Sequence, residues 1–129
     1  MLGGALIVVA AWCVAVVVCD ERHRRIPDHL TVPALVGAVA GALWSAPAVL
    51  LGGVAWALFL LCGRGIGGGD VKLAVPLGIV AAAAGGVGAV VAAVFLAALV
   101  TAVRAWGQRR AVPHGPSMVA GTLIAVVAL

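Results

Sequence analysis

The sequence predicts an all-α integral membrane protein with six transmembrane helices, and three observations lead to that fold class. Of the 129 residues, 65% are hydrophobic and only 9% are charged. The charged residues are separated by long uncharged runs, and the two longest runs carry helix-breaking residues near their centres. Soluble domains usually carry about a quarter charged residues, so this chain cannot cover a surface that faces water. A soluble enzyme, an exported domain and a disordered chain are therefore excluded.

The lengths of the uncharged runs indicate how many helices each contains. The runs cover residues 2–19, 30–62, 73–103 and, with a neutral histidine, 111–129. A membrane-spanning helix needs about 20 apolar residues, so the first and last runs each fit one helix. The middle runs hold 33 and 31 residues. Either would form a helix about 46–50 Å long, well beyond the ~30 Å hydrocarbon layer. We expect each to be a hairpin of two short helices.

Helix-breaking residues mark where these two hairpins turn. In the first, Trp44-Ser45-Ala46-Pro47 lies near the middle, and proline suits the first turn of a new helix. In the second, three glycines cluster at the centre, where they weaken a helix: Gly85, Gly86 and Gly88.

Charge distribution decides between four and six spans. With four spans, Arg64 and Lys72 lie on the opposite side from the other six basic residues. With six spans all eight lie on one side, which the positive-inside rule identifies as cytoplasmic. Both termini are then expected outside, with residues 1–129 forming a single membrane-embedded domain. The first helix can also be interpreted as a cleaved signal peptide, but its positive flank follows it, which favours a retained helix.

The four acidic residues all fall at the predicted cytoplasmic boundary: Asp20, Glu21, Asp28 and Asp70. Their absence from span centres argues against an ion pathway. Asp20 follows the first helix, where the helix dipole disfavours a negative charge. It is either a solvated acid compensated by nearby arginines or a carboxyl group with a raised pKa, suited to acid–base chemistry. For Asp28 the simplest role is a helix N-cap.

Asp70 ends a glycine-rich segment, 65–69, and precedes an apolar run. It is interpreted either as an N-cap or as a reactive carboxylate. An N-cap leaves the glycines beside it unexplained, whereas open backbone could pair with an extended peptide. Two carboxyl groups from separate helix ends are what acid proteolysis requires, because close approach lets them share one proton.

Three motifs in order resemble the type IV prepilin peptidases, polytopic aspartyl proteases that trim prepilin leaders at the cytoplasmic membrane face. They are Asp-Glu-Arg-His-Arg-Arg-Ile-Pro-Asp-His-Leu-Thr at 20–31, Gly-Gly-Gly-Asp-Val-Lys-Leu at 67–73 and Val-Pro-His-Gly-Pro at 112–116. The resemblance covers nearly the whole chain. It implies that Asp20 and Asp70 are the catalytic pair and that Asp28 is not. The residues expected to contact substrate are Gly67, Gly68, Gly69 and Lys72.

Departures from the family pattern refine these expectations. Larger members carry paired Cys-x-x-Cys motifs and also N-methylate the product, whereas Cys13, Cys19 and Cys62 form no such motif. We therefore expect a peptidase without methyltransferase activity, metal or cofactor, similar to the short enzymes of Flp/Tad-type pili. His114 replaces a commonly apolar or aromatic residue, and is interpreted as an interfacial side chain or a group that tunes the pH response. Pro33-Ala34-Leu35, a tripeptide that presenilin-like proteases also use, is taken as coincidental.

The expected partners are prepilin or pseudopilin substrates and the lipid bilayer of the bacterial inner membrane. Nucleic acid is not expected, because the eight basic residues form no face that could follow a phosphate backbone. The rival hypothesis is a non-enzymatic transporter subunit or assembly scaffold whose aspartates only cap helices. The sequence specifies no oligomeric state.

Overall fold

The computed structural model describes residues 2–23, 26–62, 68–107 and 112–128, and every regular element in these ranges is helical. The elements are α1 (Leu2–His23), α2 (Asp28–Ser45), the 3-10 helix η1 (Pro47–Val49), α3 (Leu50–Leu61), α4 (Gly68–Ala105) and α5 (Gly115–Ala128). The all-α prediction is confirmed. Several residues used above lie outside the described ranges, namely Gly65, Gly67, Arg24, Arg25, Arg64, Arg109 and Arg110.

The turn predicted in the first long run is present. The backbone of Ala46 is not helical, with φ −153° and ψ 80°, and Pro47 begins the short helix η1 that leads into α3. Proline has no N–H to continue the hydrogen-bond pattern of α2, and its ring keeps the preceding residue out of the helical region. The break is therefore a local property of this proline.

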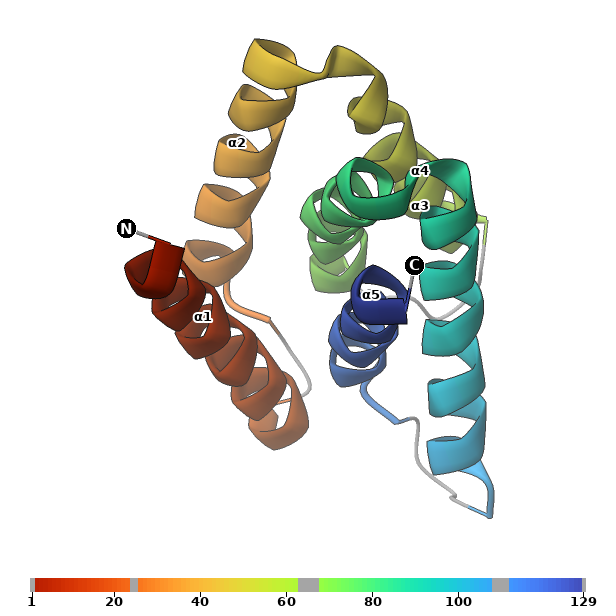
Figure 1. Cartoon of the computed structure of the whole chain (residues 1–129). Coiled ribbons are helices and arrows are strands. Elements are labelled where there is room, and N and C mark those ends of the chain that lie inside the picture. The colour runs from red at the N-terminus through yellow and green to blue at the C-terminus, as the bar shows by residue number, and fades with distance from the viewer. Residues whose placement is uncertain (1, 24–25, 63–67, 108–111, 129) are drawn as a thin grey trace.

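The second predicted turn is present inside α4. Gly85 has φ −146° and ψ 15°, and Gly86 has φ 70° and ψ −154°, so two helical halves meet at a kink. A φ of 70° with an extended ψ is accessible to glycine and strained for other residues. In Figure 1 the chain changes direction sharply between the green and the teal parts of α4.

The described residues contain one helical stretch long and apolar enough to cross a membrane, Asp70–Ala105, together with two shorter apolar helices, Pro47–Leu61 and Gly115–Ala128. The long stretch contains the kink at Gly85 and Gly86. The number of crossings and the sides on which the termini lie stay predictions.

Helix α4 is the centre of the fold. Helices α2, α3 and α5 all pack against it, whereas α1 packs against α5 and α2. No Cα atom of α1 lies within 8 Å of a Cα atom of α4 in the described ranges. Figure 1 shows α1 and α2 on one side of the molecule and α3, α4 and α5 on the other. The buried core nevertheless joins both parts, since its largest fully buried side chains include Val16, Trp56, Leu73 and Met118.

Helices α3 and α4 approach so closely that their backbones are in contact. A Cβ atom at Gly78 would lie 2.5 Å from the carbonyl oxygen of Gly52 and 2.7 Å from the Cα of Gly53. Hydrophobic driving force between helices is weak in lipid, so close backbone packing at small residues is a main source of their association. These glycines therefore set the distance between α3 and the amino-terminal half of α4.

We expect Gly78→Ala to destabilise the protein by about 1–3 kcal/mol, because the added methyl group overlaps the backbone of α3. The measurement is the free energy of unfolding in mixed micelles. Gly88→Ala is the matched control, since a methyl group added there would have no atom within 4 Å and alanine favours helix. Equal stability of the two variants would contradict the close approach of α3 and α4.

Candidate active site

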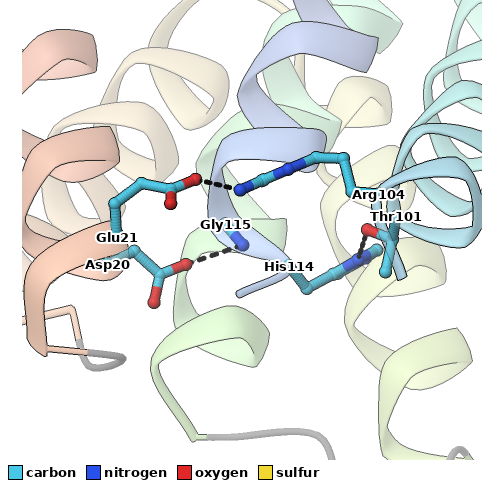
Figure 2. A network of polar contacts seen from close by, with 6 residues as sticks. All are labelled: Asp20, Glu21, Thr101, Arg104, His114 and Gly115. Atoms are coloured by element: carbon cyan, nitrogen blue, oxygen red, sulfur yellow. Dashed lines mark hydrogen bonds and ion pairs between the residues drawn. The ribbon is translucent and has the colours of Figure 1, made fainter. Parts of the chain in front are cut away.

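Asp20 lies in the last turn of α1 and is only 4% exposed. The carboxyl end of a helix carries a partial negative charge, so a buried carboxylate there is unfavourable unless another group compensates it. The compensating group comes from α5. The backbone N–H of Gly115 donates a hydrogen bond of 2.8 Å to Asp20 Oδ2 (Figure 2).

Gly115 is the first residue of α5, so its N–H has no partner within that helix and is free to bind the carboxylate. The residue before it caps the helix, since the carbonyl of His114 accepts a hydrogen bond of 3.0 Å from Met118 N–H. A Cβ atom at position 115 would overlap Asp20 Oδ2 and lie 3.1 Å from Asp20 Cγ. Only glycine at this position lets the amino end of α5 approach the Asp20 carboxylate this closely.

Two further contacts bring the end of α4 to the same place. Glu21 forms an ion pair with Arg104, and Thr101 Oγ1 forms a hydrogen bond of 2.6 Å with His114 Nδ1. In Figure 2 the Glu21–Arg104 contact lies above Gly115, and the Thr101–His114 contact lies to its right. The carboxyl ends of α1 and α4 and the amino end of α5 therefore converge around Asp20.

Asp70 lies in the first turn of α4 and is partly buried. The interpretation of Asp70 as an N-cap is wrong, because Gly68 and Gly69 before it are already helical. A carboxylate in the first turn of a helix still interacts favourably with the positive end of the dipole.

The two carboxyl groups interact electrostatically although no Cα atom of α1 lies within 8 Å of a Cα atom of α4 in the described ranges. Asp20 and Asp70 both lie just outside the uncharged runs that are expected to cross the membrane, 2–19 and 73–103. Burial raises the pKa of Asp70 to about 6, and the charge of Asp20 adds to the increase. Burial also raises the pKa of Asp20, and the hydrogen bond from Gly115 opposes that increase. Of the two nearby charged side chains, Glu21 raises the pKa of Asp20 and Arg104 lowers it. Their Cα atoms are more than 8 Å apart, and no hydrogen bond joins the two described side chains.

Asp28 and Lys72 form a second connection beside this pair. Asp28 is the first residue of α2 and Pro27 takes the N-cap position, so the interpretation of Asp28 as the N-cap is wrong. The carbonyl of Pro27 accepts the first N–H groups of the helix instead. Lys72 Nζ donates to Asp28 Oδ1 at 2.8 Å, which ties the amino ends of α2 and α4 together two residues from Asp70.

The expected substrate contacts are only partly visible. Gly67 lies outside the described residues, and Gly68 and Gly69 form the first turn of α4. The first N–H groups of a helix lack partners within it, so the backbone there is able to bind another chain. A role in substrate binding for these glycines and for Lys72 stays a prediction.

Within the described residues no group of three His, Cys, Asp or Glu side chains could hold a metal ion. Cys13, Cys19 and Cys62 are free thiols. The arrangement of the site is therefore one of carboxyl groups, backbone N–H groups and ion pairs.

Sequence reasoning missed Thr101 and Arg104 as neighbours of the site, did not predict that Glu21 pairs with Arg104, and assigned no role to Gly115. The motif at 112–116 did point to the start of the last helix, where a glycine followed by proline is the available signal. The contact with Asp20 spans 95 positions of the chain and has no local signature.

The sequence of the chain also matches the model of a known protein family. The model of the type IV leader peptidase family matches residues 7–103, about three quarters of the chain. No curated protein and no solved structure matches the chain. The matched region contains both Asp20 and Asp70 and ends before Gly115. Membership of this membrane-associated family implies peptidase, and hence hydrolase, activity. The chain, with two interacting carboxyl groups at helix ends and a family match over most of its length, belongs to the type IV leader peptidase family.

Proposed function

We propose that this protein is a membrane aspartyl endopeptidase that removes the short basic leader from type IV prepilin-like proteins. The observation that carries the proposal is the interaction of Asp20 and Asp70, two partly or fully buried carboxyl groups on separate helices. A pair of carboxyl groups that influence each other's protonation is the chemical requirement of acid proteolysis. The family match supports cleavage of leader peptides.

The chemistry follows from unequal protonation of the pair. The ionised carboxylate takes a proton from water, and the oxygen of that water attacks the carbonyl carbon of the peptide bond. The protonated carboxyl group polarises the carbonyl and then donates its proton to the leaving nitrogen. Because the two groups interact, their titration belongs to the pair. No metal or cofactor takes part in this scheme.

The proposed setting is the inner membrane of a bacterium, crossed six times, with both termini outside. The breaks at Pro47 and at Gly85–Gly86 support this topology, because they divide each long apolar run into two helices. Asp20 and Asp70 then lie at the cytoplasmic surface, where a leader peptide is accessible. Several helices are shorter than a usual span, which local thinning of the bilayer can accommodate.

The proposed substrate is a basic leader followed by a hydrophobic helix, cut after a glycine just inside the cytoplasmic surface. The backbone at Gly67, Gly68 and Gly69 and the side chain of Lys72 are the proposed substrate contacts. Methyl transfer to the new N-terminus is not part of the proposed activity, since the paired Cys-x-x-Cys motifs of larger family members are absent from the sequence.

We expect Asp20→Asn and Asp70→Asn each to lower the cleavage rate by at least about 100-fold, because each change removes one half of the acid–base pair. Asp28→Ala is the control and should keep most of the activity. The measurement is the shift of a co-expressed prepilin on a gel. Cleavage that survives either asparagine change contradicts the proposed pair. A failure to cut any prepilin favours the non-enzymatic scaffold.

The pKa of Asp70 near 6 predicts a pH dependence. One carboxyl group of the pair must be protonated to donate, and the protonated fraction of Asp70 decreases about tenfold for each pH unit above its pKa. We therefore expect kcat/KM to decrease as the pH rises above about 6, and to decrease at low pH when Asp20 is protonated too. Initial rates in detergent over about 5 pH units around the pKa of Asp70 provide the test. A rate that keeps increasing to the alkaline limit would contradict it.

A comparison of Lys72→Ala with Asp28→Ala separates substrate binding from helix anchoring. If Lys72 contacts the substrate, its loss raises KM about five- to thirtyfold, the equivalent of about 1–2 kcal/mol of binding energy, while Asp28→Ala has little effect on KM. If Lys72 acts through its ion pair with Asp28, the two variants should change kinetics and stability alike. The measurement is steady-state cleavage of a prepilin peptide.

A further inference from the structure

The environments of Asp20 and Asp70 differ in one respect that matters for catalysis. Asp20 Oδ2 accepts the backbone N–H of Gly115, whereas no hydrogen bond or ion pair involves the described carboxyl group of Asp70. Resting on the proposed function, we infer that the amino end of α5 assigns the two catalytic roles. Gly115 N–H holds Asp20 ionised as the base that activates water, and Asp70 is left as the protonated acid. Gly115 is in this scheme a positioning residue.

The hydrogen bond from Gly115 selects the charged form of Asp20. A carboxylate accepts an N–H more strongly than a neutral carboxyl group does, and the dipole of α5 adds a partial positive charge at the same point. The dipole of α1 acts in the opposite direction, so α5 offsets the unfavourable position of Asp20 at the end of its own helix. Burial is the largest influence on Asp20 and raises its pKa, but the same buried surroundings strengthen the Gly115 hydrogen bond and the dipole of α5, which oppose that increase.

The other ionisable groups around Asp20 do not change this assignment. Glu21 raises the pKa of Asp20 and Arg104 lowers it, and the two are paired with each other. From α5, His114 is directed to Thr101 by a hydrogen bond. From α2, Asp28 is paired with Lys72. The Gly115 hydrogen bond is the largest influence that lowers the pKa of Asp20. The influences on Asp70, burial and the charge of Asp20, both favour its protonated form.

The proton balance of the reaction follows from this assignment. Asp20 takes a proton from water as the new C–O bond forms, and Asp70 gives its proton to the amide nitrogen as the C–N bond breaks. After release of the acid and amine products Asp20 is protonated and Asp70 is ionised, so one proton must return from Asp20 to Asp70, directly or through solvent. The Gly115 hydrogen bond favours that return, because it stabilises charge on Asp20.

The order of titration can be measured without any substrate. The chain contains three aspartates, Asp20, Asp28 and Asp70, so a protein labelled with ¹³C at the aspartate carboxyl carbon gives a simple spectrum. In lipid nanodiscs, Asp→Asn variants assign the three signals. We expect Asp20 to ionise at lower pH than Asp70, and the pKa of Asp70 to decrease in Asp20→Asn because the charge that raises it is removed. Ionisation of Asp70 before Asp20 would overturn the assignment.

Removal of the Gly115 N–H alone tests the cause. Glycolic acid introduced at position 115 by cell-free translation replaces the amide with an ester, removing the donor while adding no atom that could overlap Asp20. A hydrogen bond to a charged group corresponds to roughly one to two pH units, so the pKa of Asp20 should increase by that amount. The same replacement at Gly88, whose surroundings are open, is the control and should leave the Asp20 titration unchanged. An unchanged Asp20 pKa in the 115 ester would overturn the role of Gly115.

A steric variant provides a kinetic test of the same contact. Gly115→Ala forces the methyl group against the Asp20 carboxylate, whereas Gly121→Ala, on the same helix, places its methyl group against the backbone of α4 at Ala93 and Ala97. When only the folded fraction of each variant is assayed, Gly115→Ala should lower kcat at least tenfold with KM nearly unchanged. It should also shift the acidic limb of the pH profile, whereas Gly121→Ala should leave that limb in place. Identical profiles would contradict the inference. If no prepilin is cleaved, the proposed function fails while the titration order still tests the division of roles.

Discussion

The contact between Asp20 and Gly115 is the constraint on which the geometry of the site depends. In the described ranges no Cα atom of α1 lies within 8 Å of a Cα atom of α4, and the two helices are linked there by the Glu21–Arg104 ion pair, beside Asp20 and not at it. Asp20 is positioned by α5, which packs closely on α4 and presents its first N–H to the carboxylate. The distance between the two acids is therefore set by three helices, with α5 as the intermediate element.

This constraint explains why the last motif of the chain lies beside the proposed catalytic pair. The family match ends at residue 103, and the third motif lies beyond it. The motif contributes backbone instead of a reactive side chain: His114 caps α5, Gly115 donates to Asp20, and the adjacent proline needs no N–H partner in the first turn. A glycine is required because a larger residue would occupy the space of the carboxylate.

The site lies where apolar helices meet charged residues, and that boundary provides the electrostatics the proposed reaction needs. Burial disfavours two negative charges together, which keeps Asp70 largely protonated in mildly acidic solution, up to a pH of about 6. The ion pairs Glu21–Arg104 and Asp28–Lys72 connect helix ends on either side. These ion pairs neutralise Glu21 and Asp28, whereas neither Asp20 nor Asp70 forms an ion pair among the described residues.

The hairpin turns and the candidate catalytic residues could be predicted from the sequence, because both depend on the local chemistry of individual residues. A proline cannot continue a helix and a glycine accepts a positive φ, so both hairpin turns were predictable at Pro47 and at Gly85–Gly86. The identity of Asp20 and Asp70 as candidates followed from residue type and motif. What only the tertiary structure decided were contacts across 83 and 95 positions, Glu21 with Arg104 and Asp20 with Gly115. The N-cap interpretations of Asp28 and Asp70 were wrong because both helical segments start earlier. Pro27 takes the N-cap position of α2, and α4 already begins at Gly68. Long-range contacts depend on how the helices pack, and no local pattern of residues encodes that packing.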